Sequence, residues 1–288
     1  MSKAGGLFKL TRFPLVFTAV ADSAVGAALV GVNLFTCAHW VPALASSAFL
    51  YAGGMVLNDL CDIERDRTLH PERPLPSGRV SVRSAGVFAL VLFALAIVSA
   101  GLAGSLAVAW ALGIVALIAV YDRLLKRWAA PGSLAMAAVR GANLGLGAVA
   151  GGIGPGMADF PWVPISILAA YVFILTLWST REDVRGGSRG LLGLLGGGLI
   201  VVPLAGAVTP LPARWAAGAA SVWIWPWIVR ALSRPEPARL MQVVRWGVLG
   251  IIPLDASFLA ARGRWAEAAV VAGLLVPALA LLPVFRKL

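Results

Sequence analysis

Charged residues are scarce in this chain. Only 13% of its 288 residues are Asp, Glu, Lys or Arg, whereas 60% are hydrophobic, and the mean hydropathy is +0.88. Soluble domains carry about 25% charged residues, so an ordinary soluble domain is excluded and a membrane protein is predicted. Cysteine is almost absent as well: Cys37 and Cys61 are the only two, on opposite predicted sides of the membrane. This excludes a disulfide framework.

Long apolar runs recur along the whole sequence. A helix needs about 20 apolar residues to cross a bilayer, and ten runs approach that length. We expect an all-α, multi-pass transmembrane bundle of nine helices, or ten if every run spans, around a central cavity that opens to the cytoplasmic side, in a single domain over residues 1–288. The ten runs are Phe13–Phe35, Trp40–Leu60, Val82–Ala100, Leu102–Tyr121, Leu134–Ile153, Trp162–Ser179, Leu191–Val208, Ala213–Leu232, Val243–Ala261 and Ala266–Phe285.

The basic residues are spread over many loops. The net charge is +11, but no single patch or tail gathers it, so no nucleic-acid partner is expected. With a cytoplasmic N-terminus, 20 of the 24 Lys and Arg residues fall on the inner side, as the positive-inside rule requires. We therefore expect a multi-pass protein of the cell membrane, of the bacterial inner-membrane type, with cytoplasmic active-site loops. Arg262 and Arg264 break the pattern; if one of the last two runs does not span, the C-terminus changes side.

Oxygen-bearing side chains cluster where the second apolar run ends. Asn58, Asp62 and Asp66 recur every fourth residue, which places them on one helix face, and Asp59 lies one step round. Ionised groups are costly near a bilayer, so a partner is expected. Magnesium prefers such oxygen ligands and leaves positions open for phosphate. Arg67 and Arg73 follow and are suited to bind phosphate oxygens.

Polar residues also lie inside apolar runs. Arg140 and Asn143 are three residues apart in the fifth run, on one helix face. An unpaired arginine would be costly there. Either these residues serve an active site, or Arg140 forms a structural pair with Asp22 or Asp122. For Asp22 and Asp255, hydrogen bonding between helices is the favoured interpretation.

The acidic cluster resembles the motif of a known family. Asn58-Asp59-x-x-Asp62-x-x-x-Asp66, followed by Arg73 to Arg79, is similar to the first aspartate-rich motif of the UbiA superfamily of intramembrane prenyltransferases. Thr11 to Pro14, leading into Asp22 and Gly26, resembles the first helix of that family, and Tyr121 to Lys126 resembles the end of its fourth. The resemblance covers most of the chain.

The second motif of the family is altered. It normally has two aspartates four residues apart after the sixth helix; here Asp183 matches the first, and Gly187 stands at the second. Two alternatives follow: either Glu182, one residue out of register, supplies the missing oxygen, or a second metal ion binds more weakly or not at all. Such erosion resembles an EboC-like side branch of the superfamily.

The resemblance implies a magnesium-dependent prenyltransferase that moves a prenyl group from a prenyl diphosphate to an aromatic or other small or lipid acceptor within the membrane lipids. The implied catalytic residues are Asp62, Asp66, Lys126 and Arg73. The implied substrate-binding residues are Asn58, Asp59, Arg67, Tyr121, Arg140, Asn143 and Arg181, and the implied Mg²⁺ ligands are Asn58, Asp62, Asp66 and Asp183.

Three alternatives stay open. The acidic cluster also fits a solvated loop beside the membrane. Because Gly187 removes a carboxylate, the chain also fits a non-catalytic component that binds or transports a lipid diphosphate. A membrane phosphotransferase that uses a nucleotide-activated alcohol is disfavoured, because its Asp-Gly and Ala-Arg elements are missing around Asp59 to Asp66.

Overall fold

A computed structural model describes residues 3–36, 38, 40–180, 189–205 and 211–287 of the chain. These residues form helices and connecting turns and contain no strand, which confirms the predicted all-α fold. The helices are α1 (Lys3–Leu10), α2 (Val16–Leu29), α3 (Val41–Cys61), α4 (Ile63–Leu69), α5 (Val82–Ala103), α6 (Ser105–Val120), α7 (Ala129–Ala150), α8 (Trp162–Ser179), α9 (Arg189–Ala205), α10 (Leu211–Ser233), α11 (Pro237–Leu249), α12 (Ile251–Ala260), α13 (Trp265–Gly273) and α14 (Leu275–Lys287). A 3₁₀ turn, Phe13–Leu15, and a π-helix, Tyr121–Leu125, complete them.

A helix lies on each of the ten apolar runs. Within the described residues, eight helical stretches are long and apolar enough to cross a membrane, with α11 and α12 counted as one stretch and α13 and α14 as another. The described apolar part of α9, Gly190–Val202, is shorter. Large apolar side chains such as Leu90, Val98 and Val163 face outward, as expected for surfaces in contact with lipid tails. The chain is an integral membrane protein.

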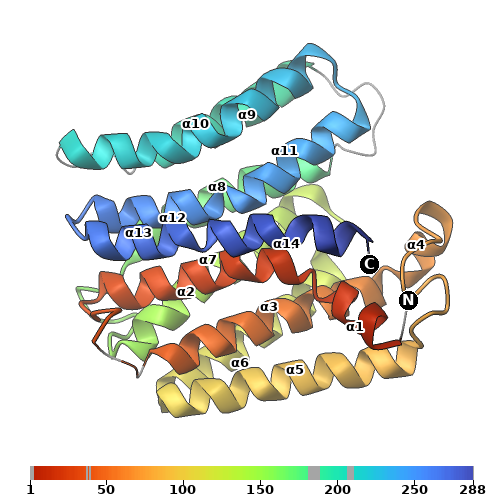
Figure 1. The fold of residues 1–288 in the computed structure, drawn as a ribbon, viewed down its shortest axis with the longest axis horizontal. Coiled ribbons are helices and arrows are strands. Elements are labelled where there is room, and N and C mark those ends of the chain that lie inside the picture. Colours follow the sequence, from red (N-terminus) through yellow and green to blue (C-terminus); the bar gives the residue numbers. More distant parts are fainter. Residues whose placement is uncertain (1–2, 37, 39, 181–188, 206–210, 288) are drawn as a thin grey trace.

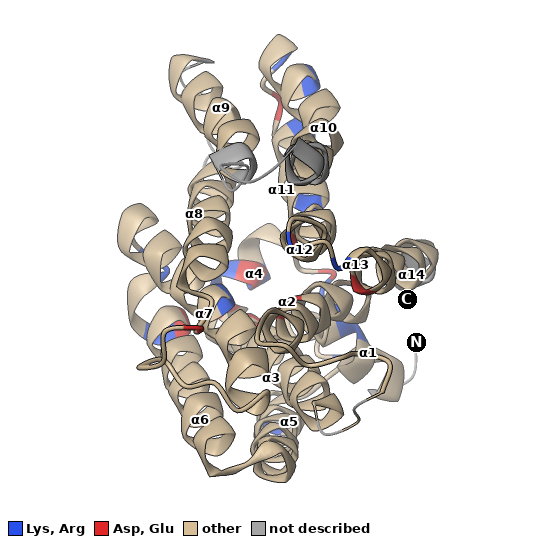
Figure 2. Ribbon diagram, turned by 90° about the vertical axis from the view of Figure 1, so that its left-hand side faces the viewer, with Lys and Arg blue, Asp and Glu red and all other residues tan. Residues whose placement is uncertain are grey.

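The long helices lie side by side along one direction (Figure 1). The α9–α10 pair forms one edge of the bundle, and α5 lies at the opposite edge. Both termini lie at the end that carries α4. Figure 2 looks along the helices from the other end and shows the acidic and basic residues of α4 between α7, α8 and α12.

Glycines set the distance between α2 and α7. A Cβ atom at Gly26 would overlap the carbonyl oxygen of Leu144, and one at Gly147 would overlap that of Ser23. Small residues allow membrane helices to approach closely in this way. The close approach brings the polar residues of α7 within reach of those of α2.

Candidate active site

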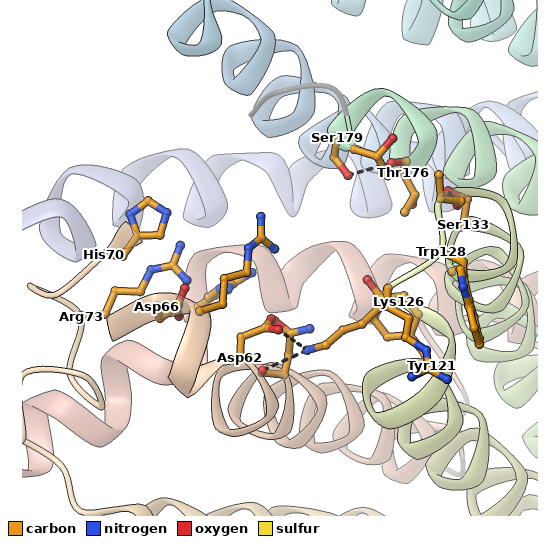
Figure 3. Close-up of a pocket in the computed structure, with 17 residues that line it drawn as sticks. Asp62, Asp66, His70, Arg73, Tyr121, Lys126, Trp128, Ser133, Thr176 and Ser179 are labelled. Atoms are coloured by element: carbon orange, nitrogen blue, oxygen red, sulfur yellow. Dashed lines mark hydrogen bonds and ion pairs between the residues drawn. The ribbon is translucent and has the colours of Figure 1, made fainter. Parts of the chain in front are cut away.

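A pocket of about 720 Å³ opens at the end of the bundle where α4 lies. Its lining comes from segments far apart in the sequence: the N-terminal turn, the α3–α4 junction, the π-helix, and the facing ends of α7 and α8. In Figure 3, Asp62 and Lys126 lie on one side of the pocket, and Thr176 and Ser179 lie on the other. The lining residues are Arg12, Asn58, Asp62, Arg65, Asp66, His70, Arg73, Tyr121, Lys126, Arg127, Trp128, Ala129, Gly132, Ser133, Thr176, Ser179 and Thr180.

The helical repeat of the acidic motif places its oxygens on one face. Asn58 belongs to the last turn of α3, Asp62 joins α3 to α4, and Asp66 lies in α4. The helical hydrogen-bond pattern continues through the junction: the Asp62 N–H donates to the Asn58 carbonyl at 3.0 Å, and the Asp66 N–H donates to the Asp62 carbonyl at 2.8 Å. All three side chains therefore line the same pocket.

Two cations pair with the two carboxylates. Lys126 Nζ lies 2.8 Å from Asp62 Oδ1, and Arg73 Nη1 lies 2.7 Å from Asp66 Oδ2. We call Asp62, Asp66, Arg73 and Lys126 the acid–base wall. It places two anionic and two cationic groups at the end of an apolar bundle, a combination suited to a metal-bound phosphate ester.

The π-helix after α6 positions Lys126. Tyr121–Leu125 adopts this wider turn, and its end directs the ammonium group back to α3. Lys126 Nζ also lies 3.5 Å from Asp122, whose carboxylate accepts a 2.7 Å hydrogen bond from the Asn58 amide. The amide nitrogen of Asn58 is thus engaged, and its side-chain oxygen is left for a ligand. Asp122 is a supporting residue that the sequence motif did not reveal.

Arg12 is a pocket residue that the sequence analysis did not select. Its backbone is left-handed, with φ of 49°, where the chain turns into the 3₁₀ segment, and a non-glycine residue rarely adopts this conformation. The guanidinium donates to Asp59 Oδ1 at 3.0 Å. Asp59 is almost buried and does not line the pocket, so it acts here through Arg12. The Arg12-Phe13-Pro14 sequence was a usable signal.

Other predicted site residues lie elsewhere. Arg67 pairs with Glu64 at 2.7 Å, is more than half exposed, and does not line the pocket. Arg140 and Asn143 are also absent from the lining. Arg181 and Asp183, with Glu182 and Gly187, lie outside the described residues. The substrate-binding roles of Arg67, Arg140, Asn143 and Arg181 and the metal-binding role of Asp183 remain predictions.

A buried polar cluster explains Arg140 and Asn143. Asp22 of α2 accepts from Arg140 Nη2 at 3.2 Å and from Asn143 Nδ2 at 3.0 Å, and all three residues are buried. This confirms Asp22 as a hydrogen-bonding residue between helices and selects it over Asp122 as the partner of Arg140. Asp255 of α12 lies beside Asp22 and interacts with both Asp22 and Arg140.

The donor set at the pocket fits magnesium. Among the described residues, no three acidic, His or Cys side chains gather closely enough to hold a metal ion alone. Asp62, Asp66 and the Asn58 oxygen nevertheless offer hard oxygen ligands to one space. Magnesium is usually bound by one or two carboxylates and completes its shell with water and phosphate oxygens. These three residues would therefore bind the ion together with a phosphorylated ligand.

Comparison with known proteins identifies the protein family to which the chain belongs. The model of the UbiA prenyltransferase family matches residues 15–241. The chain is therefore a member of the UbiA prenyltransferase family, as its first motif indicates.

The chain is also similar in sequence to individual proteins of this family. The digeranylgeranylglyceryl phosphate synthase of Methanopyrus kandleri is 32% identical over 272 residues, which are 90% of this chain and 91% of the relative. The enzyme of the same name from Sulfolobus acidocaldarius is 33% identical over 178 residues, 62% of this chain and 61% of that protein. The chain thus spans about three fifths of the length of the latter relative.

Solved structures show the same fold. A UbiA homologue from Aeropyrum pernix K1 superposes with a TM-score of 0.68 at 20% identity, covering 85% of this chain and 96% of that one. A homologue from Archaeoglobus fulgidus, bound to GPP and Mg²⁺, gives a TM-score of 0.61 at 20% identity and covers 93% of this chain and 99% of that one.

Proposed function

We propose that this chain is a magnesium-dependent prenyltransferase that transfers a prenyl group from a prenyl diphosphate to a lipid alcohol. The observation that carries the proposal is the pairing within the acid–base wall, Lys126 with Asp62 and Arg73 with Asp66. A metal-bound diphosphate would supply a cation to the carboxylates and anionic oxygens to Lys126 and Arg73, so that no charge is left unpaired. Family membership and the names of the relatives support the same reaction.

In this proposal each pocket residue has a separate role in binding or catalysis. Lys126 and Arg73 hold the diphosphate, and their charge stabilises it as it departs. Asp62, Asp66 and the Asn58 oxygen would hold the magnesium ion, which would supply further positive charge to the leaving group. Arg12, fixed by Asp59, adds a cation at the rim of the pocket.

The bond changes balance without an oxidant or reductant. The allylic carbon–oxygen bond of the donor breaks, and its electron pair leaves with the pyrophosphate. A lone pair of the acceptor hydroxyl forms the new carbon–oxygen bond, and the hydroxyl proton passes to pyrophosphate or water. The product is an ether.

For the acceptor we propose a glyceryl phosphate that already carries one prenyl ether. The named relatives are synthases of a doubly prenylated glyceryl phosphate, which requires such an acceptor. The sequence analysis also left an aromatic acceptor open, and the relatives favour the lipid. We further propose that the pocket faces the cytoplasm, because this places most basic residues on the inner side.

The test uses purified protein in lipid vesicles with labelled prenyl diphosphate, magnesium and the prenylated glyceryl phosphate. We expect a labelled ether and an equal amount of pyrophosphate. Tight binding of the diphosphate with neither product would instead support the lipid-diphosphate binding protein that the Gly187 substitution suggests.

A further inference from the structure

Opposite the acid–base wall the pocket carries a row of hydroxyl groups. Thr176, Ser179 and Thr180 lie at the end of α8 and line the pocket. We call these three residues the hydroxyl wall. Neither the motif nor the reaction proposed above uses them. In Figure 3, Thr176 and Ser179 lie across the pocket from Asp62 and Lys126.

The hydroxyl protons of this wall are already engaged. Thr176 donates to the Val172 carbonyl at 2.8 Å, Ser179 to the Thr176 carbonyl at 2.7 Å, and Thr180 to the Leu177 carbonyl at 2.8 Å. Hydroxyls bonded back onto their own helix keep two lone pairs each and can only accept further hydrogen bonds. The hydroxyl wall therefore suits a ligand that donates O–H groups and does not suit a diphosphate, which only accepts.

An arginine, Arg127, also lines the pocket. The Arg127 guanidinium lies over the ring of Trp128, 4.1 Å from its centroid, and both residues line the pocket. Arg12, Arg73 and Lys126 pair with acids, whereas Arg127 forms no salt bridge with a described acidic residue. Stacking fixes the plane of a guanidinium and leaves its N–H edge free for a phosphate.

We infer that the hydroxyl wall and Arg127 form the site for the acceptor's head group, which is an alcohol bearing a phosphate. The inference rests on the proposed function and deepens it. The acid–base wall holds the donor diphosphate, the hydroxyl wall accepts hydrogen bonds from the alcohol, and Arg127 binds the acceptor's phosphate. The attacking oxygen is thereby held across the pocket from the bond that breaks.

A binding measurement tests this site independently of turnover. Calorimetric titration compares the prenylated glyceryl phosphate with the same lipid alcohol lacking phosphate, in wild type and in Arg127→Gln. We expect the variant to lose about tenfold or more in affinity for the phosphorylated lipid and little for the neutral one, because one charge-assisted contact is removed. The matched control is Arg123→Gln, an exposed arginine of the same segment outside the lining.

A second set of variants tests the hydroxyl wall. Thr176→Val keeps the shape of the side chain, and together with Ser179→Ala it should weaken both lipids several-fold while leaving the affinity for the prenyl diphosphate unchanged. Ser233→Ala removes a hydroxyl that donates to the Arg230 carbonyl outside the pocket and serves as control. Equal affinities of wild type and Arg127→Gln for the phosphorylated lipid would overturn the inference. Absence of transfer by a wild type that binds both substrates would overturn only the proposed function.

Discussion

Lys126 connects two carboxylates that come from different helices. It lies 2.8 Å from Asp62 at the end of α3 and 3.5 Å from Asp122 in the π-helix. Its side chain is only 17% exposed, so its charge is poorly screened by solvent. A cation held in this way is preorganised to meet a departing pyrophosphate.

Replacing Lys126 by Met should lower kcat by about 100-fold or more, as is typical when one preorganised charge is lost from a transition state. Lys126→Arg keeps the charge and should retain more activity than Met. Both rates are measured as pyrophosphate release at saturating donor and magnesium. Equal rates for the Met variant and wild type would remove Lys126 from the mechanism.

The buried ion pair between Asp22 and Arg140 is expected to affect the stability of the protein. Its two side chains are 0% and 8% exposed, and a buried ion pair that loses one partner leaves the other charge uncompensated. Asp22→Ala should therefore lower the free energy of unfolding by about 3–5 kcal/mol. Unfolding is followed by circular dichroism during a denaturing-detergent titration.

A double variant provides the control. Asp22→Asn combined with Arg140→Met removes both charges and should be more stable than Asp22→Ala alone. If Asp22→Ala unfolds at the same detergent fraction as wild type, the pair contributes nothing to stability, and the substrate role first predicted for Arg140 regains weight.

Contacts between helices explain Arg262 and Arg264, the two arginines that break the positive-inside pattern. Arg262 donates to the Leu29 carbonyl at 3.1 Å, and Arg264 donates to the carbonyls of Ala28 and Val32. The Ala28 and Leu29 carbonyls belong to the last turn of α2, where the helix dipole favours a cation, and Val32 follows shortly after the helix. The sequence could not reveal this, because the contacts join residues more than 200 positions apart.

The α2–α7 contact yields a prediction of its own. In Gly147→Ala the new Cβ would meet the backbone of Ser23 and Ala27, which no rotamer change can relieve. We expect a loss of about 1–3 kcal/mol from overpacking, measured by the same detergent titration. Gly113→Ala on α6, where nothing lies within 4 Å of a new Cβ, is the control and should be neutral or slightly stabilising. Equal stability of both variants would contradict the close packing of α2 on α7.

The short irregular elements were also not predicted from the sequence. The predicted apolar run ends at Tyr121, and hydrophobic spacing over Tyr121–Leu125 does not distinguish a π-helix from an α-helix. The junction at Asp62 was likewise invisible, although the helical hydrogen bonds across it preserve the predicted face. Periodicity thus predicted which residues share a face but not where the backbone departs from a regular helix.

On the scale of the whole molecule, composition and hydropathy were sufficient for the fold class, since burial in lipid demands long apolar helices. The first motif was sufficient to predict that Asn58, Asp62, Asp66 and Arg73 line one pocket, because these residues are close in sequence. Arg12, Arg127 and the hydroxyl wall were not predicted, because they reach the pocket only when the N-terminal turn and the facing ends of α7 and α8 come together. A single hydroxyl or arginine in an apolar sequence gives no such signal.

If prenyl transfer occurs at the acid–base wall, it depends on the carboxylates of Asp62 and Asp66. Wild type, Asp62→Ala and Asp66→Ala are compared in lipid vesicles for transfer of label from prenyl diphosphate to the prenylated glyceryl phosphate, with circular dichroism to show that each is folded. We expect the wild type to form the ether only with magnesium and both folded variants to show only background transfer. Wild-type rates in both variants would contradict this dependence.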